Sequence, residues 1–109
     1  MTGWWSLGER AVMAHTWPGW LGAYLLANSL NGVVRYVGRS DTEVRSRLLQ
    51  HAANGEYRYF WVEHIANEVD AFLRECGLYH HYRRTLDNAV HPRRPTGCGD
   101  ACPRCSMYD

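Results

Sequence analysis

The stretch LGAYLLA at residues 21–27, followed by VVRYVG at residues 33–38, decides the fold of this chain. Both segments are rich in aliphatic and aromatic side chains, which favours extended strands. The turn sequence between them ends in Asn31-Gly32, a pair that suits the positive backbone angles of a tight hairpin. We therefore expect two antiparallel strands joined by a short turn.

The sequence on the C-terminal side of this hairpin predicts two helices and a further strand. A capping-box pattern at residues 40–43 opens a helix that continues to about Ala53. Residues 56–64 alternate between two faces, which is typical of a third strand. Asn67 is a good N-cap for the longest helix, and beyond Tyr82 regular structure is expected to end. These elements predict an α/β (α+β) fold, in which a three-stranded antiparallel sheet is flanked by helices.

Length and composition indicate a single folded domain. At 109 residues the chain is large enough for one modest core. Apolar residues at 46% and aromatic residues at 13% argue against disorder, and no apolar run reaches the roughly 20 residues that cross a membrane. The start MTGWW has neither the basic nor the apolar region of a secretory signal. We expect an intracellular, cytoplasmic protein that does not bind membranes.

Arginine is the sole source of permanent positive charge in the side chains, and it is clustered. The formal net charge is only +1, yet all twelve Lys and Arg residues are Arg. Guanidinium groups bind phosphates in bidentate fashion, so each cluster is a candidate nucleic-acid contact. A bias in genomic base composition would explain why the chain has Arg and no Lys. Such a bias would not explain why the arginines are clustered. The two groups are Arg35, Arg39, Arg45 and Arg47, and then Arg83, Arg84, Arg93 and Arg94.

Five side chains have the chemistry of a site that cuts phosphodiesters. Eleven residues separate Tyr24 from Tyr36, and Arg47 lies one helical turn before His51. Two phenols can activate water by hydrogen bonding, and a guanidinium can hold a phosphate. Glu75 is the candidate carboxylate for a divalent ion.

A purely structural role is the alternative for these side chains. His51 fits a half-buried core histidine, and Glu75 fits a solvated helix residue paired with Arg74 or Arg84. Cys76 lies on an apolar helical stripe and is expected in the core. Large aromatic residues in a small domain usually pack as well. We assign to packing the four tryptophans near the N-terminus, Trp4, Trp5, Trp17 and Trp20.

The order of these segments resembles the GIY-YIG nuclease family. GAY at residues 22–24 stands where that family has Gly-Ile-Tyr, and YVG at residues 36–38 stands for its Tyr-Ile-Gly. RLLQH at residues 47–51 is similar to the arginine-leucine-x-x-histidine of the first helix. AFLRE at residues 71–75 is similar to the helical segment that ends in the metal-binding glutamate.

The resemblance continues to Asn88, which, followed by Pro92, is similar to the closing asparagine of the family. Five pieces in order span residues 21–92, the expected nuclease domain. Residues 1–20 then form a Trp-rich N-terminal extension, and residues 93–109 form a Cys-rich tail.

The resemblance implies a metal-dependent endonuclease that hydrolyses DNA phosphodiester bonds. Tyr24 and Tyr36 would position and deprotonate water, Arg47 would bind the phosphate, and His51 would assist by hydrogen bonding. Glu75 would hold one Mg²⁺ or Mn²⁺, with water and phosphate oxygens in the remaining positions. A homodimer with two-fold symmetry would cut both strands of a duplex. The alternative is a noncatalytic nucleic-acid-binding module with a zinc-stabilised tail.

The chain departs from the family pattern at two places. Ala23 replaces the isoleucine, which leaves a smaller side chain in the core and does not touch the chemistry. The interval from Gly38 to Arg47 is one residue longer than expected, so Arg45 is an alternative to Arg47. Asn88 either braces the site or shapes a turn.

Three cysteines in the tail indicate a structural zinc site. Cys98, Cys102 and Cys105 lie within eight positions, and the Cys-Pro-x-Cys turn lets two thiolates reach one tetrahedral ion. Reduced thiols or a redox pair are the alternatives, and the chain would then be a zinc or redox domain with incidental tyrosines. Candidates for a fourth zinc ligand are Cys76, His80, His81 and His91.

Overall fold

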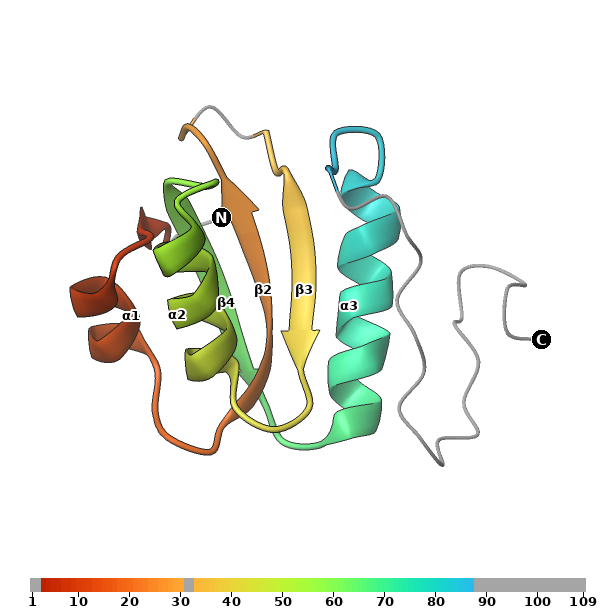
Figure 1. Ribbon diagram of the computed structural model, residues 1–109. Coiled ribbons are helices and arrows are strands. Elements are labelled where there is room, and N and C mark those ends of the chain that lie inside the picture. Colours follow the sequence, from red (N-terminus) through yellow and green to blue (C-terminus); the bar gives the residue numbers. More distant parts are fainter. Residues whose placement is uncertain (1–2, 31–32, 88–109) are drawn as a thin grey trace.

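The computed structural model describes residues 3–30 and 33–87 of the chain. These residues form a small α+β fold, as predicted (Figure 1). None of the helices in these two ranges is long and apolar enough to cross a membrane. The elements follow in the order β1 (Trp5–Ser6), α1 (Glu9–His15), β2 (Leu21–Ala27), β3 (Tyr36–Ser40), α2 (Val44–Asn54), β4 (Tyr59–Ile65) and α3 (Glu68–Tyr82).

The strands form one antiparallel sheet in the order β1-β4-β2-β3, of which Figure 1 shows β4, β2 and β3 side by side. The predicted antiparallel pairing is confirmed, because β2 has the predicted bounds and pairs with β3. Strand β3 begins at Tyr36 and not at the predicted Val33, and the predicted turn residues Asn31 and Gly32 lie outside the described residues. The prediction of three strands is wrong, since β1 adds a fourth strand beside β4. A strand of two residues is too short to show the alternation by which strands are recognised.

Both faces of the sheet are covered, which explains why β2 is apolar throughout. Alternation along β2 sends Tyr24 and Leu26 to the core beneath α1 and α2. Ala23 and Leu25 lie on the opposite face and pack with Leu78 of α3. Figure 1 shows α2 and α3 on either side of β2 and β3. Because β3 is an edge strand, groups from the two helical layers can meet around its free edge.

Local capping sets the ends of the helices. The hydroxyl of Ser40 accepts the backbone N–H of Glu43 at 2.9 Å, just before α2 begins. Gly55 ends α2 with a φ of 72°, a left-handed conformation that favours glycine. Asn67 caps α3 as predicted, because its side chain accepts the N–H of Asp70 at 2.8 Å.

Of the four N-terminal tryptophans, Trp4 and Trp5 are half-buried, and Trp17 and Trp20 are exposed. Trp4 and Trp5 pack against the two cores, as expected. Trp17 and Trp20 are 50% and 45% exposed, so their assignment to packing is wrong. Cys76 is buried beside Phe72, in agreement with its assignment to the core.

Candidate active site

A glycine allows the Tyr24 ring to cross the neighbouring strand. Tyr24 is buried in β2 and lies opposite Gly38 of β3. A Cβ atom added at Gly38 would lie 2.4 Å from Cζ and 2.5 Å from the hydroxyl oxygen of Tyr24. The phenol therefore occupies the space of a missing side chain and reaches toward the free edge of the sheet.

His51 and Tyr36 surround the Tyr24 phenol. Helix α2 packs on this face and brings His51 Nε2 to 2.9 Å from Tyr24 Oη. Tyr36, at the start of β3, stacks on Tyr24 with ring centroids 6.1 Å apart. Its ring centroid also lies 4.8 Å from that of His51. The two tyrosines and the histidine singled out in the sequence thus form one cluster.

Arg47 joins this cluster, whereas Arg45 does not. Arg47 is exposed and lies one turn before His51, and its positive charge lowers the pKa of the Tyr24 phenol. Arg45 instead donates to the hydroxyl of Thr16 at 3.0 Å and to the Thr16 carbonyl. Of the two alternatives, the geometry favours Arg47 for the site. Arg45 attaches the loop after α1 to α2.

Glu75 reaches the same cluster from the other helical layer. Helix α3 places its carboxylate 2.9 Å from Arg39 Nη1, and its charge acts on Tyr24. Arg39 also binds both oxygens of Asp41, at 2.9 and 3.3 Å. The Glu75 side chain is only 12% exposed. The alternative of a solvated Glu75 paired with Arg74 or Arg84 is therefore wrong, because Glu75 pairs with Arg39 and Arg74 pairs with Glu63.

Burial sets the protonation states in the cluster. It raises the pKa of Glu75 to about 7, although nearby arginine charges lower it. Burial and the neighbouring Tyr36 raise the pKa of Tyr24 more than Arg47 lowers it, so the phenol is protonated at neutral pH. Burial, followed by the charge of Arg47, lowers the pKa of His51, so its imidazole is neutral at pH 7.

Glu75 is a carboxylate that suits a divalent cation. A buried acid whose ionised form is disfavoured gains strongly from a positive ion beside it. Within residues 3–30 and 33–87, no group of three or more His, Cys, Asp or Glu side chains gathers at one point. Mg²⁺ keeps several waters and takes one or two carboxylates together with phosphate oxygens, so the proposal of a single protein carboxylate does not depend on such a group.

Several predicted residues lie outside the described part of the chain. They are Asn88, Arg93, Arg94 and the candidate zinc ligands His91, Cys98, Cys102 and Cys105. Arg35, Arg83 and Arg84 are described and differ in their surroundings. Arg35 forms an ion pair with Asp87 at 2.6 Å. Arg83 and Arg84 are exposed at the C-terminal end of α3.

Sequence reasoning missed Asp41 as a member of the site. Asp41 binds the Nε and Nη2 groups of Arg39, which leaves Nη1 directed at Glu75. The signal was a carboxylate two residues after an arginine at the end of a strand, where both side chains lie near one another. Asp41 therefore helps to orient the Glu75 carboxylate through Arg39.

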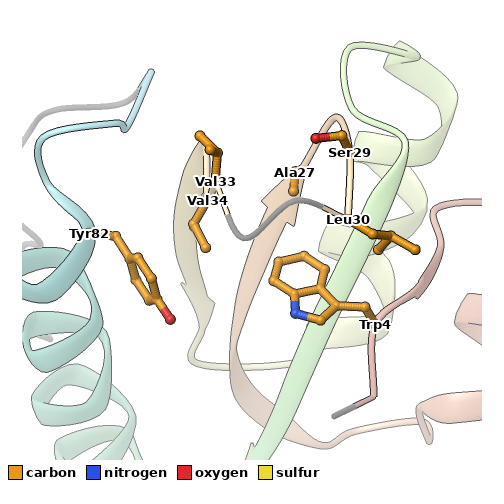
Figure 2. Close-up of a pocket in the computed structure, with 7 residues that line it drawn as sticks. All are labelled: Trp4, Ala27, Ser29, Leu30, Val33, Val34 and Tyr82. Atoms are coloured by element: carbon orange, nitrogen blue, oxygen red, sulfur yellow. The ribbon is translucent and has the colours of Figure 1, made fainter. Parts of the chain in front are cut away.

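Two cavities lie apart from the tyrosine cluster. One has a volume of about 440 Å³ and is lined by Trp4, Tyr82, Ala27 at the end of β2 and residues of the segment between β2 and β3. Figure 2 shows its lining residues. Another, of about 350 Å³, lies beside Trp20 and His64. Neither cavity is lined by Tyr24, Tyr36 or Glu75, so both are separate from the candidate active site.

No family model, no curated protein and no solved structure matches this chain. The candidate site is therefore defined by the geometry of its own side chains.

Gly38→Ala is expected to displace the Tyr24 ring and destabilise the fold. The added methyl group would overlap a rigid phenol, because the nearest ring atom is 2.4 Å from the Cβ position. We expect a loss of about 1–3 kcal/mol in the free energy of unfolding, measured by urea denaturation. Gly77→Ala is the matched control, since a Cβ there meets nothing within 4 Å and alanine favours a helix. Wild-type stability of Gly38→Ala would contradict this placement of the ring.

Proposed function

We propose that this chain is a GIY-YIG-like endonuclease that hydrolyses DNA phosphodiester bonds with the help of a divalent cation. The supporting observation is that the Tyr24 phenol, 2.9 Å from His51 Nε2, lies within range of the charges of Arg47 on α2 and Glu75 on α3. Two of these polar groups are nearly buried, which is costly for folding and is not required for packing. Such an arrangement is typical of a catalytic site.

The proposed proton path leads from water to His51. Tyr24 Oη takes a proton from the attacking water while its own proton passes to His51 Nε2, 2.9 Å away. His51 can accept this proton because its lowered pKa keeps it neutral. The relay suits a phenol with a raised pKa, since no phenolate has to form in advance. The new bond joins the water oxygen to phosphorus, and the bond to the leaving oxygen breaks.

Arg47 supports this step by neutralising charge on the phosphate. Its guanidinium is exposed, so its N–H donors can bind the non-bridging oxygens. Mg²⁺ or Mn²⁺, held by Glu75, would supply further neutralisation of this charge. Asp41 and Arg39 hold the Glu75 carboxylate in a fixed orientation.

Purified protein is expected to nick supercoiled plasmid DNA in Mg²⁺ or Mn²⁺ and to stop when EDTA removes the ion. The reason is that the site has one arginine for the phosphate and needs a second positive charge there. Agarose gels at increasing protein concentration measure the conversion of supercoiled to open-circular DNA.

The same assay separates the proposal from its alternative. Nicking that persists in EDTA would contradict a role for the cation. Plasmid binding in gel shifts without nicking in either ion would favour a noncatalytic nucleic-acid-binding module. In that case the exposed Arg83 and Arg84 would be the contacts to test.

A further inference from the structure

Trp17 and Trp20 form an ordered aromatic pair on the surface. They are 50% and 45% exposed, and their ring centroids lie 5.0 Å apart at an interplanar angle of 27°. Both rings also contact His64 edge-on, with centroids 5.7 and 4.3 Å from its imidazole. Exposing two indoles gives up the burial that most large aromatic residues contribute to stability. This pair therefore calls for a role other than packing.

Hydrogen bonds fix the loop that carries the two tryptophans. The carbonyl of Trp20 accepts the N–H of Val44 at 2.8 Å, at the start of α2. The N–H of Gly19 donates to the Glu43 carboxylate at 2.7 Å. Arg45 binds the hydroxyl and the carbonyl of Thr16. The indole rings are thus held in position before any ligand binds, which lowers the entropy cost of binding.

A cavity of about 350 Å³ opens beside this pair. It is lined by Gly19, Trp20, Leu21, His64, Ile65 and Ala66. Its lining combines the indole of Trp20 and the imidazole of His64 with the apolar residues Leu21, Ile65 and Ala66. Nδ1 of His64 has no hydrogen-bond partner among the described residues. The space suits a flat heteroaromatic ring with polar edges, because such a ring can stack on indole and use polar groups at its rim.

The aromatic pair lies on the face of the sheet that carries the tyrosine cluster. Gly22 pairs with His64, and Tyr24 follows two residues along the same strand and on the same face. Helix α2 begins against Trp20 and carries Arg47 one turn later. From Trp20 to Tyr24 the strand spans about 13 Å, which is roughly four stacked nucleotides. A single polynucleotide strand can reach both places.

We propose that Trp17, Trp20 and the adjoining cavity form a nucleobase-stacking site for an unpaired base of the polynucleotide substrate. This inference rests on the proposed nuclease function and adds a preference for single-stranded or distorted DNA near the cut. The Glu43 carboxylate beside the loop repels phosphate, so the base and not the backbone contacts the tryptophans. In this proposal Arg47, on the next turn of α2, binds the phosphate.

The test measures binding without cleavage. Glu75→Gln protein in EDTA is titrated into a single-stranded oligonucleotide that carries 2-aminopurine, whose fluorescence falls on stacking. We expect quenching, and about a tenfold weaker affinity when Trp17→Ala or Trp20→Ala is added. Trp20→Phe should keep part of the affinity because it keeps a stacking face. Met13→Ala is the matched control, since Met13 is 45% exposed on α1 outside the pair, and it should bind like the parent.

Three outcomes would overturn the stacking site. One is equal affinity of the alanine variants and the parent, with folding verified by circular dichroism. Another is an equal loss of affinity for a fully paired duplex, which has no unpaired base to stack. The third is a halved mass of Trp20→Ala in sedimentation, which would make the pair a contact between two copies of the chain. Absence of plasmid nicking would instead contradict the nuclease function and would leave this binding measurement valid.

Discussion

Glu75→Gln is expected to abolish metal-dependent nicking, with a loss of at least about 10³-fold, while the protein stays folded. The substitution removes the negative charge that attracts the cation, and several kcal/mol of charge stabilisation in the transition state are lost with it. Size and hydrogen bonding to Arg39 are nearly preserved, because the amide oxygen can accept from Nη1 as the carboxylate does. Plasmid nicking measures the loss of activity, and direct titration with Mn²⁺ measures the loss of cation binding.

The same substitution is expected to stabilise the protein at alkaline pH. The pKa of Glu75 is raised from 4.5 to about 7 in the folded state, so folding favours the protonated acid. The contribution of protonated Glu75 to the free energy of unfolding is fully present below pH 4.5 and is lost as the pH rises through 7. Glutamine has no such dependence. The difference in unfolding free energy between Glu75→Gln and wild type should therefore grow by about 3 kcal/mol between pH 4.5 and 8.

Urea denaturation of both proteins at the two pH values measures this difference. Because other titrating groups are common to both proteins, they cancel in the comparison. A difference that does not change with pH would show that the carboxylate is not buried as described. If Glu75→Gln is more stable than wild type and has lost activity, then Glu75 lowers the stability of the fold and is retained for function.

Tyr24→Phe is expected to slow nicking by about 10²- to 10⁴-fold, which is the range for loss of a general base. The phenyl ring can still lie over Gly38, so the packing of β2 on β3 is kept. Only the hydroxyl that contacts His51 is removed. Stability should fall by only about 1 kcal/mol, the usual value for one hydrogen bond.

Tyr57→Phe is the matched control for this loss. Tyr57 is a second buried phenol, and its hydroxyl donates to Asp87 at 2.9 Å instead of to His51. Removing the Tyr57 hydroxyl also breaks one hydrogen bond, but it leaves Tyr24 and His51 of the proposed proton path unchanged. We expect nicking within a few-fold of wild type. Equal losses in the two variants, measured on the same plasmid, would assign the Tyr24 effect to packing.

Features that depend on neighbouring residues could be predicted from the sequence. Strand β2 is an apolar run bounded by turn residues, and its bounds match the prediction. The cap at Asn67 depends on one side chain and one backbone group three residues later. The pairing of Arg47 with His51 follows from helical spacing alone. In each case the physical cause lies within one turn of helix or one strand.

Features that depend on contacts between distant segments could not be predicted in this way. Strand β1 exists only because β4 offers an edge to two residues of the N-terminal segment. The partner of Glu75 proved to be Arg39, 36 residues away, and not its sequence neighbour Arg74. Exposure of Trp17 and Trp20 depends on how the loop after α1 attaches to α2. Composition carries no information on such contacts.

A crystal structure with Mn²⁺ soaked in tests most directly whether the groups around the edge of β3 form a cation site. Manganese is chosen because its anomalous scattering locates the ion. The account predicts one ion about 2.1 Å from a Glu75 carboxylate oxygen, on the side of Tyr24 and Arg47, with Arg39 still bound to Asp41. An ion bound elsewhere, or Glu75 without an ion at saturating Mn²⁺, would contradict it.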